Sequence, residues 1–280
     1  QRCSTFNAMV DTAFGTPTSL EQFTQWAQWI NYNGYRAIYE SRSLHRKGVI
    51  IWMSHPCWPS MVWQTYDYYF EPTAAYFGAK KGSAPIRIQW NPVSSNVEVV
   101  NNNASDLYGL SAYASIWSYD GKKLFEKSTS LDSKEDSTSP LFPLSFDMPG
   151  LSDAYFIKLK LTQGDRVIAD NFYWEGKKDG DYKQLLTLPS VQLQTVSSAD
   201  LKNGNWEMKA TLKNSSEVPA LMIRLKVVSG KSGERILPVF YEDNYFSLLP
   251  GESKEVVIRF KDEDAHGETP RLEVSGFNVK

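Results

Sequence analysis

Two stretches of sequence, NASDLYGLSAYASI at residues 103–116 and NSSEVPALMIRLKV at residues 214–227, decide the fold. They start 111 residues apart (103 against 214), and in each a polar turn leads into a run with an apolar residue at every second position. This period of two is typical of a β-strand with one buried face. A pattern that returns after this interval predicts two β-sandwiches of about 100 residues each.

The same period extends from about residue 86 to the end of the chain, interrupted by turn signals such as Asp120-Gly121 and Pro250-Gly251. Strands are expected at residues 96–100, 110–119, 155–161, 167–174, 206–212, 221–228 and 255–260. A charged, glycine-rich stretch at residues 176–188 has the composition of a linker. The predicted sandwiches are therefore residues 85–187 and residues 188–280.

The first 84 residues begin with a helical pattern. Apolar side chains recur every three or four positions from residue 20 to about residue 44. Thr18 with Glu21, and Ser19 with Gln22, both have the spacing of a capping box. The sequence therefore predicts a helix over residues 20–44 and leaves its cap open between these two pairs.

An apolar run without alternation, VIIWM at residues 49–53, follows this helix. Such a run is typical of a strand that is buried on both faces in a parallel sheet. A short helix is expected at residues 73–81, just before Gly82. One strand does not make a sheet, so residues 1–84 are predicted to be a fragment of α/β architecture that packs against the first sandwich or a second copy of the chain.

Composition excludes several classes of protein. The chain has 280 residues, of which 41% are hydrophobic and 22% charged, as in ordinary globular proteins. The formal net charge of −2 and the lack of a basic cluster argue against a nucleic-acid partner. No apolar stretch reaches the roughly 20 residues of a membrane span. The two cysteines, Cys3 and Cys57, are too few for a disulfide framework.

The termini and motifs narrow the possibilities further. The chain begins at Gln1 without a signal-peptide core, so we expect either a removed leader or a piece of a longer protein. A glycine-rich phosphate loop, a Cys-x-x-Cys pair and a nucleophile elbow are all missing. The sequence therefore predicts no cofactor.

Aromatic residues are the unusual feature, at 14% with nine tryptophans, and they are concentrated in the segment WMSHPCWPSMVWQ at residues 52–64. Ligands of α/β sheets and barrels bind at the carboxyl ends of strands, which is where this segment would begin. Trp52, His55, Trp58 and Trp63 are therefore predicted to line a site, with indole faces suited to stacking on sugars. The alternative is that the indoles fill a crevice between domains.

Neither a metal site nor a catalytic acid pair is expected in this segment. His55 has only Cys57 at ligand spacing, so a polar contact to a substrate hydroxyl is preferred to metal binding. Glycoside hydrolysis needs two carboxyls at a set separation. Glu40 is expected to form an ordinary pair on the helix surface, and Asp67 and Glu71 are expected to hold the loop.

The first part of the chain resembles the end of the catalytic barrel in glycoside hydrolase family 2, in particular the exo-β-D-glucosaminidase branch near the β-mannosidases. The similar segments are GVIIWM at 48–53, WPS at 58–60, WQ at 63–64 and AYFGAKK at 75–81. In the second predicted sandwich, LPV at 237–239, YEDN at 241–244 and SLLPGE at 247–252 are similar too. The resemblance thus covers nearly the whole chain.

The resemblance implies a fold and a place in a larger protein. The fold class would be mainly β, with two Ig-like β-sandwiches preceded by the C-terminal end of a (β/α)8 TIM barrel over residues 1–84. Residues 49–53 would be the eighth barrel strand and residues 73–81 the eighth helix. Both catalytic glutamates of the family would precede this chain. Trp52 would form the floor of a sugar subsite, beside a non-proline cis peptide.

The implied function is that of a retaining β-glycosidase of the periplasm or the extracellular space, acting on terminal glucosaminide- or mannoside-type sugars. Its partners would be a glycan and the remainder of the parent barrel, and this chain alone would be inactive. The branch usually has Leu-Asn where Ser54-His55 stands, and Cys57 is unusual there, which leaves the sugar open. The alternative is a non-catalytic carbohydrate-binding or Ig-like interaction module.

Overall fold

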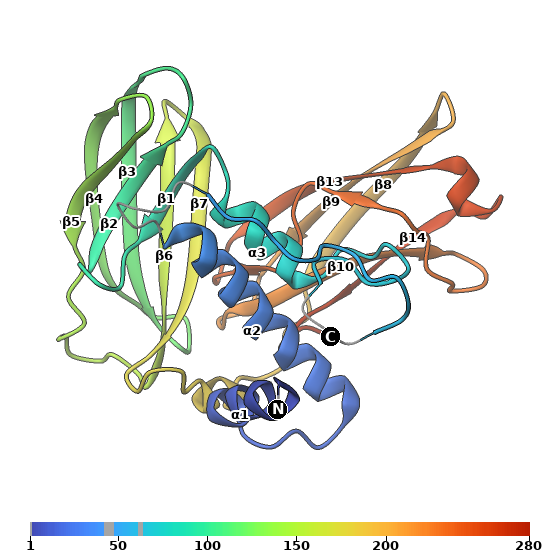
Figure 1. Cartoon of the computed structure of the whole chain (residues 1–280), viewed down its shortest axis with the longest axis horizontal. Coiled ribbons are helices and arrows are strands. Elements are labelled where there is room, and N and C mark those ends of the chain that lie inside the picture. Colours follow the sequence, from blue (N-terminus) through green and yellow to red (C-terminus); the bar gives the residue numbers. More distant parts are fainter. Residues whose placement is uncertain (1, 42–47, 61–63) are drawn as a thin grey trace. The chain divides into compact units, whose positions relative to one another are not determined.

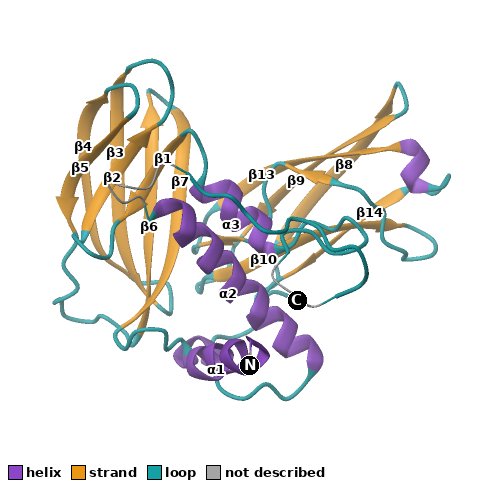
Figure 2. Cartoon of the chain, viewed as in Figure 1, coloured by secondary structure: helices purple, strands orange, loops and turns teal. Residues whose placement is uncertain are grey.

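The computed structural model describes residues 2–41, 48–60 and 64–280, with side chains from Ser4 onward. Helices α1 (Arg2–Phe14), α2 (Leu20–Glu40) and α3 (Ala74–Gly82) precede the strands (Figures 1 and 2). None of the helices in these ranges is long and apolar enough to cross a membrane. The rest of the described chain is mainly β, as predicted.

Seven strands form the first sandwich: β1 (Ile86–Trp90), β2 (Asn96–Asn101), β3 (Leu107–Ser118), β4 (Lys123–Ser133), β5 (Ser137–Pro143), β6 (Ala154–Gln163) and β7 (Arg166–Gly176). They make two antiparallel sheets in the orders β1-β2-β5 and β4-β3-β6-β7. Alternate side chains of both sheets, such as Val99, Leu110 and Ile157, share one core. The predicted period of two therefore corresponds to burial of one face of each sheet.

The second sandwich contains β8 (Gln194–Lys202), β9 (Asn205–Lys213), β10 (Ala220–Ser229), β11 (Phe240–Tyr241), β12 (Phe246–Leu248), β13 (Ser253–Lys261) and β14 (Pro270–Ser275). Its antiparallel sheets have the orders β11-β13-β9-β8 and β12-β10-β14. Two 3₁₀ helices, η1 (Lys183–Thr187) and η2 (Asp262–Ala265), complete the described elements. Leu212, Leu225 and Ile258 are among its buried side chains.

Two buried asparagines show how the two sandwiches correspond. Asn101 and Asn214 are fully buried, and each Nδ2 donates to a carbonyl oxygen four residues later, that of Ser105 at 2.9 Å and that of Val218 at 2.8 Å. These positions are 113 residues apart (101 against 214), not the 111 of the sequence match. An alignment that is shifted by two residues keeps the same side chains on the buried face of a strand. The strands at residues 110–119 and 221–228 were therefore still correctly predicted.

The strands that the sequence did not predict include two at sheet edges. β4 and β8 each pair on one side only, with β3 and β9 respectively, and most of their side chains are exposed. A strand without a consistently buried face has no hydrophobic alternation to detect. Helix α1 was also missed, because it lies in what was expected to be a loop before residue 20.

The predicted strand at residues 49–53 is absent from the structure. The end of the fragment's long helix contacts the first sandwich, through Arg36 and Glu40 on Asn171, and packing of residues 49–53 on a second copy of the chain stays a prediction. These residues have no strand hydrogen bonding, and the side chain of Ile50 is 98% exposed. A strand exists only through hydrogen bonds to a neighbour, and the described chain provides no parallel neighbour for this run.

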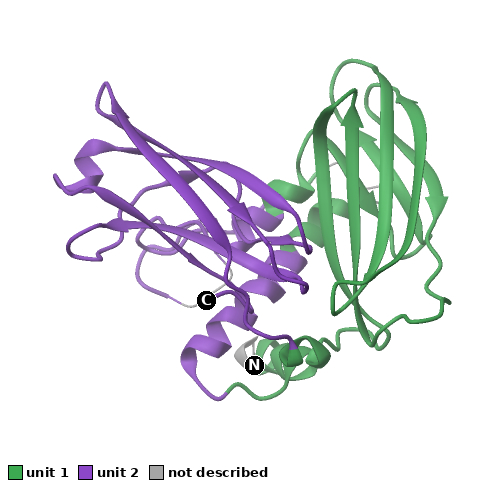
Figure 3. Ribbon diagram, turned by 180° about the vertical axis from the view of Figure 1, so that it is seen from behind, with its two compact units in different colours: residues 1–17, 35–49, 79–187 green, residues 18–34, 50–78, 188–280 purple. Residues whose placement is uncertain are grey.

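The chain divides into two compact units (Figure 3). One contains residues 1–17, 35–49 and 79–187, and the other contains residues 18–34, 50–78 and 188–280. Each unit holds one sandwich, and both α2 and α3 begin in the second unit and end in the first. The residues before 85 are thus shared between the units, and the domain boundaries at 84 and 187 stay predictions.

Within the second unit, α2 and α3 pack closely. Ser19 Oγ accepts from Gln22 N at 3.2 Å and Gln22 Oε1 accepts from Thr18 N at 2.7 Å, so the second predicted capping pair closes the start of α2. Gln28 Oε1 accepts from Ala74 N at 2.8 Å and satisfies the first turn of α3. At Gly78 the helices approach so closely that a Cβ would overlap the carbonyl oxygen of Tyr32.

We therefore expect opposite effects of alanine at two helical glycines. Gly78→Ala should lower the free energy of unfolding of the second unit by about 2 kcal/mol or more, because backbone must move to admit the methyl group. Gly34→Ala, where no atom lies within 4 Å of the new Cβ, should raise it by about 0.5–1 kcal/mol through helix propensity. Urea unfolding of the two variants tests this, and equal effects would show that the approach at Gly78 is not tight.

Candidate functional site

The aromatic loop, defined as residues 52–60 and 64–73, is the candidate functional site. Trp52 is 81% exposed and Trp58 is 67% exposed, whereas His55 is half-buried. Among the described residues neither indole makes a contact with another aromatic ring. The peptide bond between Trp52 and Met53 is cis, as the resemblance implied. Trp63, the fourth predicted site residue, lies outside the described residues.

His55 is held by the aromatic residues at the far end of the loop. Its ring stacks on Phe70 with centroids 4.5 Å apart and planes inclined by 9°, and the Tyr68 ring lies 6.5 Å away. His55 Nε2 is 3.3 Å from the carbonyl oxygen of Tyr68. One face of the imidazole is thus covered. In the described ranges there is no group of three His, Cys, Asp or Glu side chains that could hold a metal ion, and Cys57 is an exposed free thiol.

Hydrogen bonds join the two arms of the loop. The carbonyl oxygen of Ser54 accepts from Thr65 N at 3.1 Å, Thr65 Oγ1 at 3.1 Å and Tyr66 N at 2.9 Å. The carbonyl oxygen of Thr65 in turn accepts from Thr73 N at 2.9 Å and Thr73 Oγ1 at 3.0 Å. The backbone just after Trp52 is therefore tied to the segment that leads into α3.

The tip of the loop is a tight turn built by Asp67. Its Oδ1 accepts from Tyr69 N at 2.8 Å and from Glu71 N at 2.9 Å, and Asp67 N donates to the Glu71 carbonyl oxygen at 3.0 Å. Phe70 has a positive φ of 67°, which is uncommon for a residue other than glycine. The prediction that Asp67 and Glu71 hold the loop agrees with these contacts.

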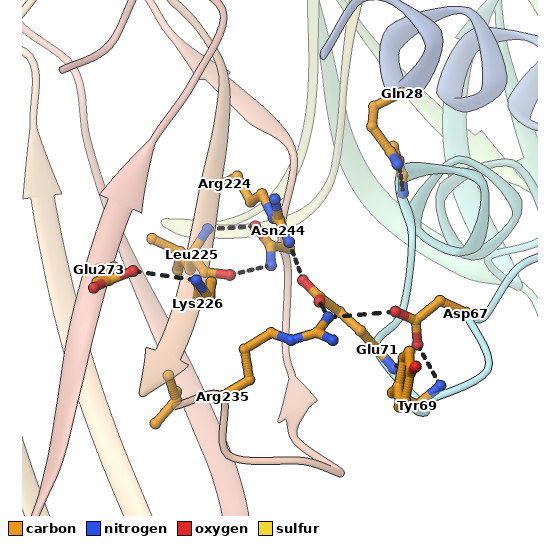
Figure 4. Close-up of polar contacts among 12 residues, drawn as sticks. Gln28, Asp67, Tyr69, Glu71, Arg224, Leu225, Lys226, Arg235, Asn244 and Glu273 are labelled. Atoms are coloured by element: carbon orange, nitrogen blue, oxygen red, sulfur yellow. Dashed lines mark hydrogen bonds and ion pairs between the residues drawn. The ribbon is translucent and has the colours of Figure 1, made fainter. Parts of the chain in front are cut away.

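Two arginines of the second sandwich bind this turn (Figure 4). The Glu71 carboxylate forms hydrogen-bonded ion pairs with Arg224 of β10 and with Arg235, and Arg235 also lies 3.3 Å from Asp67. Burial alone would raise the pKa of Glu71, but the two guanidinium groups hold it below its ordinary value. The sequence did not point to these arginines, since Arg224 is one polar residue in an alternating segment and Arg235 lies between β10 and β11 in a segment without a motif.

Three consecutive aromatic side chains, those of Tyr68, Tyr69 and Phe70, are exposed at the tip. The Arg235 guanidinium lies 5.4 Å from the centre of the Tyr69 ring. Aromatic faces that are held by polar contacts and remain open to solvent are suited to stacking on the apolar face of a sugar ring. The exposed aromatic side chains of the loop are thus compatible with the predicted carbohydrate site.

Glu71 does not have the properties of the general acid of a glycosidase. A general acid needs a carboxyl whose pKa is raised toward neutrality, whereas the pKa of Glu71 is lowered and its oxygens are engaged by arginine. Glu40 is not part of this loop. It is buried in the first unit rather than on the helix surface as predicted, because the polar side chains of β7 and Arg36 surround it.

Comparison with known proteins shows which proteins this chain is similar to. Residues 171–279 match the family described as the exo-β-D-glucosaminidase Ig-fold domain. The exo-β-D-glucosaminidase of Streptomyces avermitilis is 31% identical over 98% of this chain and 34% of its own length. The mannosylglycoprotein endo-β-mannosidase of Lilium longiflorum is 26% identical over 95% of this chain and 34% of its own length.

A solved structure agrees with these relatives. The crystal structure of the Amycolatopsis orientalis exo-chitosanase superposes with a TM-score of 0.92 at 26% identity, covering 99% of this chain and 36% of that chain. The chain therefore spans about a third of the length of the relatives that it matches. These matches confirm the predicted resemblance to the exo-β-D-glucosaminidases, near the β-mannosidases.

Proposed function

Because this chain is homologous over almost its whole length to about a third of the exo-β-D-glucosaminidases of glycoside hydrolase family 2, we propose that it is the C-terminal part of a retaining β-glycosidase. The parent enzyme hydrolyses terminal β-linked sugars of the glucosaminide or mannoside type. We place it in the periplasm or the extracellular space. The observation that carries this proposal is homology that includes the exposed aromatic loop as well as the sandwiches.

The apolar composition of residues 49–53 and the exposure of Ile50 support the proposal that this run belongs to a barrel. This run is the most apolar segment of the first 84 residues, yet Ile50 is exposed and unpaired. Such a run is suited to burial between two parallel neighbours, which the remainder of the parent barrel would supply. In this proposal residues 1–84 are the end of that barrel and residues 49–53 become its eighth strand on assembly.

The aromatic loop then forms one wall of the sugar site. Trp52 provides the floor on which the sugar ring stacks, and Trp58 and Trp63 extend the apolar wall. The half-buried His55 offers a ring nitrogen to a substrate hydroxyl. Both catalytic glutamates come from the part of the barrel that precedes this chain, so the wall binds and orients the sugar without taking part in bond cleavage.

The purified 280-residue chain should therefore show no turnover of p-nitrophenyl β-D-glucosaminide or β-D-mannoside above the uncatalysed rate, whereas the parent protein should hydrolyse at least one of them. A chromogenic assay measures both. Robust turnover by the chain alone would overturn the placement of the catalytic acids outside it.

The same preparation distinguishes the alternative of a non-catalytic carbohydrate-binding module. That alternative is suggested by the Ig-fold family match, which lies within residues 171–279. It requires that the chain bind glucosamine oligomers with an affinity that survives Trp52→Ala. Calorimetric titration of both forms decides between them, since a barrel wall without its barrel should bind weakly and only through the loop.

A further inference from the structure

The arginine clamp, defined as Asp67, Glu71, Arg224 and Arg235, links the aromatic loop to the second sandwich. The Glu71 side chain is only 13% exposed and receives both guanidinium groups. An ion pair that is partly withdrawn from water and shared between two arginines is stronger than an isolated surface pair. The clamp therefore attaches the aromatic loop to the second sandwich more strongly than an isolated surface ion pair would.

The sandwich side of the clamp is rigid. Leu225, next to Arg224 in β10, has both backbone groups bound by the buried Asn244: its N–H donates to Asn244 Oδ1 at 2.7 Å and its carbonyl accepts from Asn244 Nδ2 at 2.9 Å. Arg224 also pairs with Ser275 in the register of β10 and β14. Figure 4 shows the contacts between Leu225 and Asn244 on one side of the clamp and Asp67 and Tyr69 on the other.

The loop side of the clamp leads to the proposed sugar-binding residues through contacts already described. Asp67 orders the turn that presents Phe70, and Phe70 stacks on His55. The carbonyl of Ser54, two residues after Trp52, is bound by Thr65 and Tyr66 immediately before Asp67. Every step from Arg224 to His55 is thus a direct contact within the second unit.

We propose that the arginine clamp makes the second sandwich a positioning element for the sugar site, with Arg224 and Arg235 as its positioning residues. This inference rests on the proposed function. Neither arginine touches the sugar. They hold the aromatic loop in its binding arrangement before substrate arrives. Substrate binding therefore does not have to include the entropy loss of ordering the loop.

The effect of breaking the clamp follows from this role. If Arg224→Met leaves the loop in its binding arrangement for about a tenth of the time, the apparent affinity for substrate falls about tenfold. Once sugar is bound the loop is ordered again, so kcat should change by less than about threefold. The variant should therefore show a raised KM with a nearly constant kcat. Loss of a catalytic group or general unfolding would not produce this pattern.

Lys226 provides a matched control two positions along β10, on the same face of the strand. It forms a comparable ion pair, 3.3 Å from Glu273, that does not involve the loop. Lys226→Met removes one cation from the same strand, and Arg224→Lys retains the charge while losing the planar guanidinium group. We expect normal KM for Lys226→Met and partial rescue for Arg224→Lys.

The first measurement is hydrogen exchange on the 280-residue chain, which does not depend on enzymatic activity. Peptides covering residues 52–60 and 64–73 should exchange at least about tenfold faster in Arg224→Met and in Glu71→Gln than in Lys226→Met, with β9 and β13 unchanged. Unchanged loop exchange would overturn the clamp itself.

The second measurement is KM and kcat of the same variants in the parent enzyme with p-nitrophenyl β-D-glucosaminide and β-D-mannoside. A raised KM with nearly constant kcat in Arg224→Met supports positioning. Faster loop exchange with unchanged KM would overturn it and leave the proposed function intact. An inactive wild-type parent would overturn the proposed function and the positioning role together, which separates the two failures.

Discussion

Trp52→Ala in the parent enzyme is expected to lower kcat/KM by about 10²–10³-fold, the largest loss of any single change in the aromatic loop. An indole that forms the floor of a sugar site contributes as a buried aromatic anchor does, about 3–4 kcal/mol, and each 1.36 kcal/mol corresponds to a factor of ten. The indole is 81% exposed in this chain, so its surface is available to a ligand. Steady-state kinetics with both p-nitrophenyl glycosides measure the loss.

The exposure of Trp52 also separates binding from folding. A side chain that is largely in solvent contributes little to stability, so Trp52→Ala should leave the unfolding of the 280-residue chain unchanged within about 0.5 kcal/mol. Trp117→Ala in β3 is the matched tryptophan control and should change kcat/KM by less than about threefold. If Trp52→Ala kept full activity, or Trp117→Ala lost as much, Trp52 would not be the floor of the site.

The predictions from sequence were correct for elements whose local hydrophobic pattern or end signal determines their structure. Strands β3, β6, β9 and β13 bury alternate side chains on one face, so a period of two was sufficient to find them. Helix α3 ends at Gly82 as expected. The rule of alternating burial fails for β8, which is exposed on both faces. Residues 49–53, predicted from their apolar run to be a buried strand, form no strand in the described chain.

The polar side chains of the candidate site and of the first unit were harder to predict. Trp52, His55 and Trp58 were singled out because tryptophan and histidine are rare and stand together in the sequence, and their role in a sugar site stays a prediction. Arg224 was not singled out, because its partner Glu71 is 153 positions away, and no local pattern reports a pair at that separation. Glu40 was found but misplaced for the same reason, since it is buried by residues of β7.

From the buried environment of Glu40 we expect Arg36 to contribute strongly to the stability of the first unit. Asn171 Nδ2 donates to Glu40 Oε1 at 2.7 Å, and the Tyr173 hydroxyl lies 3.1 Å from both carboxylate oxygens. Arg36 of the same helix lies 3.9 Å from Glu40 Oε2, donates to Asn171 Oδ1 at 3.1 Å and covers the Tyr173 ring at 4.0 Å. The Arg36 guanidinium thus places a positive charge beside a carboxylate that has lost its water, and Arg87 adds a further favourable charge.

The pH dependence of this network has a definite sign. Burial raises the pKa of Glu40, against the opposing effects of Arg36, Asn171 and Tyr173. Burial also raises the pKa of Glu175 in β7 to about 7, which Arg36 opposes. A carboxyl whose pKa is higher in the folded state holds its proton more tightly there, so stability is greatest below the unfolded pKa and decreases as pH rises through the folded pKa. For Glu175 this window runs from its ordinary value of 4.5 to about 7.

Arg36→Met should therefore destabilise the first unit by about 3–5 kcal/mol at pH 8, the usual cost of leaving a buried charge without its partner. The loss should be clearly smaller at pH 5, where Glu40 and Glu175 take up protons and no longer need a cation. The measurement is hydrogen exchange of β6 and β7 at both pH values, referred to the intrinsic exchange rate at each pH, which reports on this unit alone.

A second substitution shows whether the uncompensated charge is the cause. Arg36→Met combined with Glu40→Gln removes both charges and should recover at least about half of the loss at pH 8, because a neutral amide is far cheaper to bury than a carboxylate. Lys123→Met, which breaks the exposed pair with Glu126 in the same sandwich, should cost less than about 1 kcal/mol at either pH. If Arg36→Met were equally destabilising at pH 5 and pH 8, or if Glu40→Gln gave no recovery, lost packing of the long side chain would explain the effect, and Arg36 would not compensate the buried carboxylates.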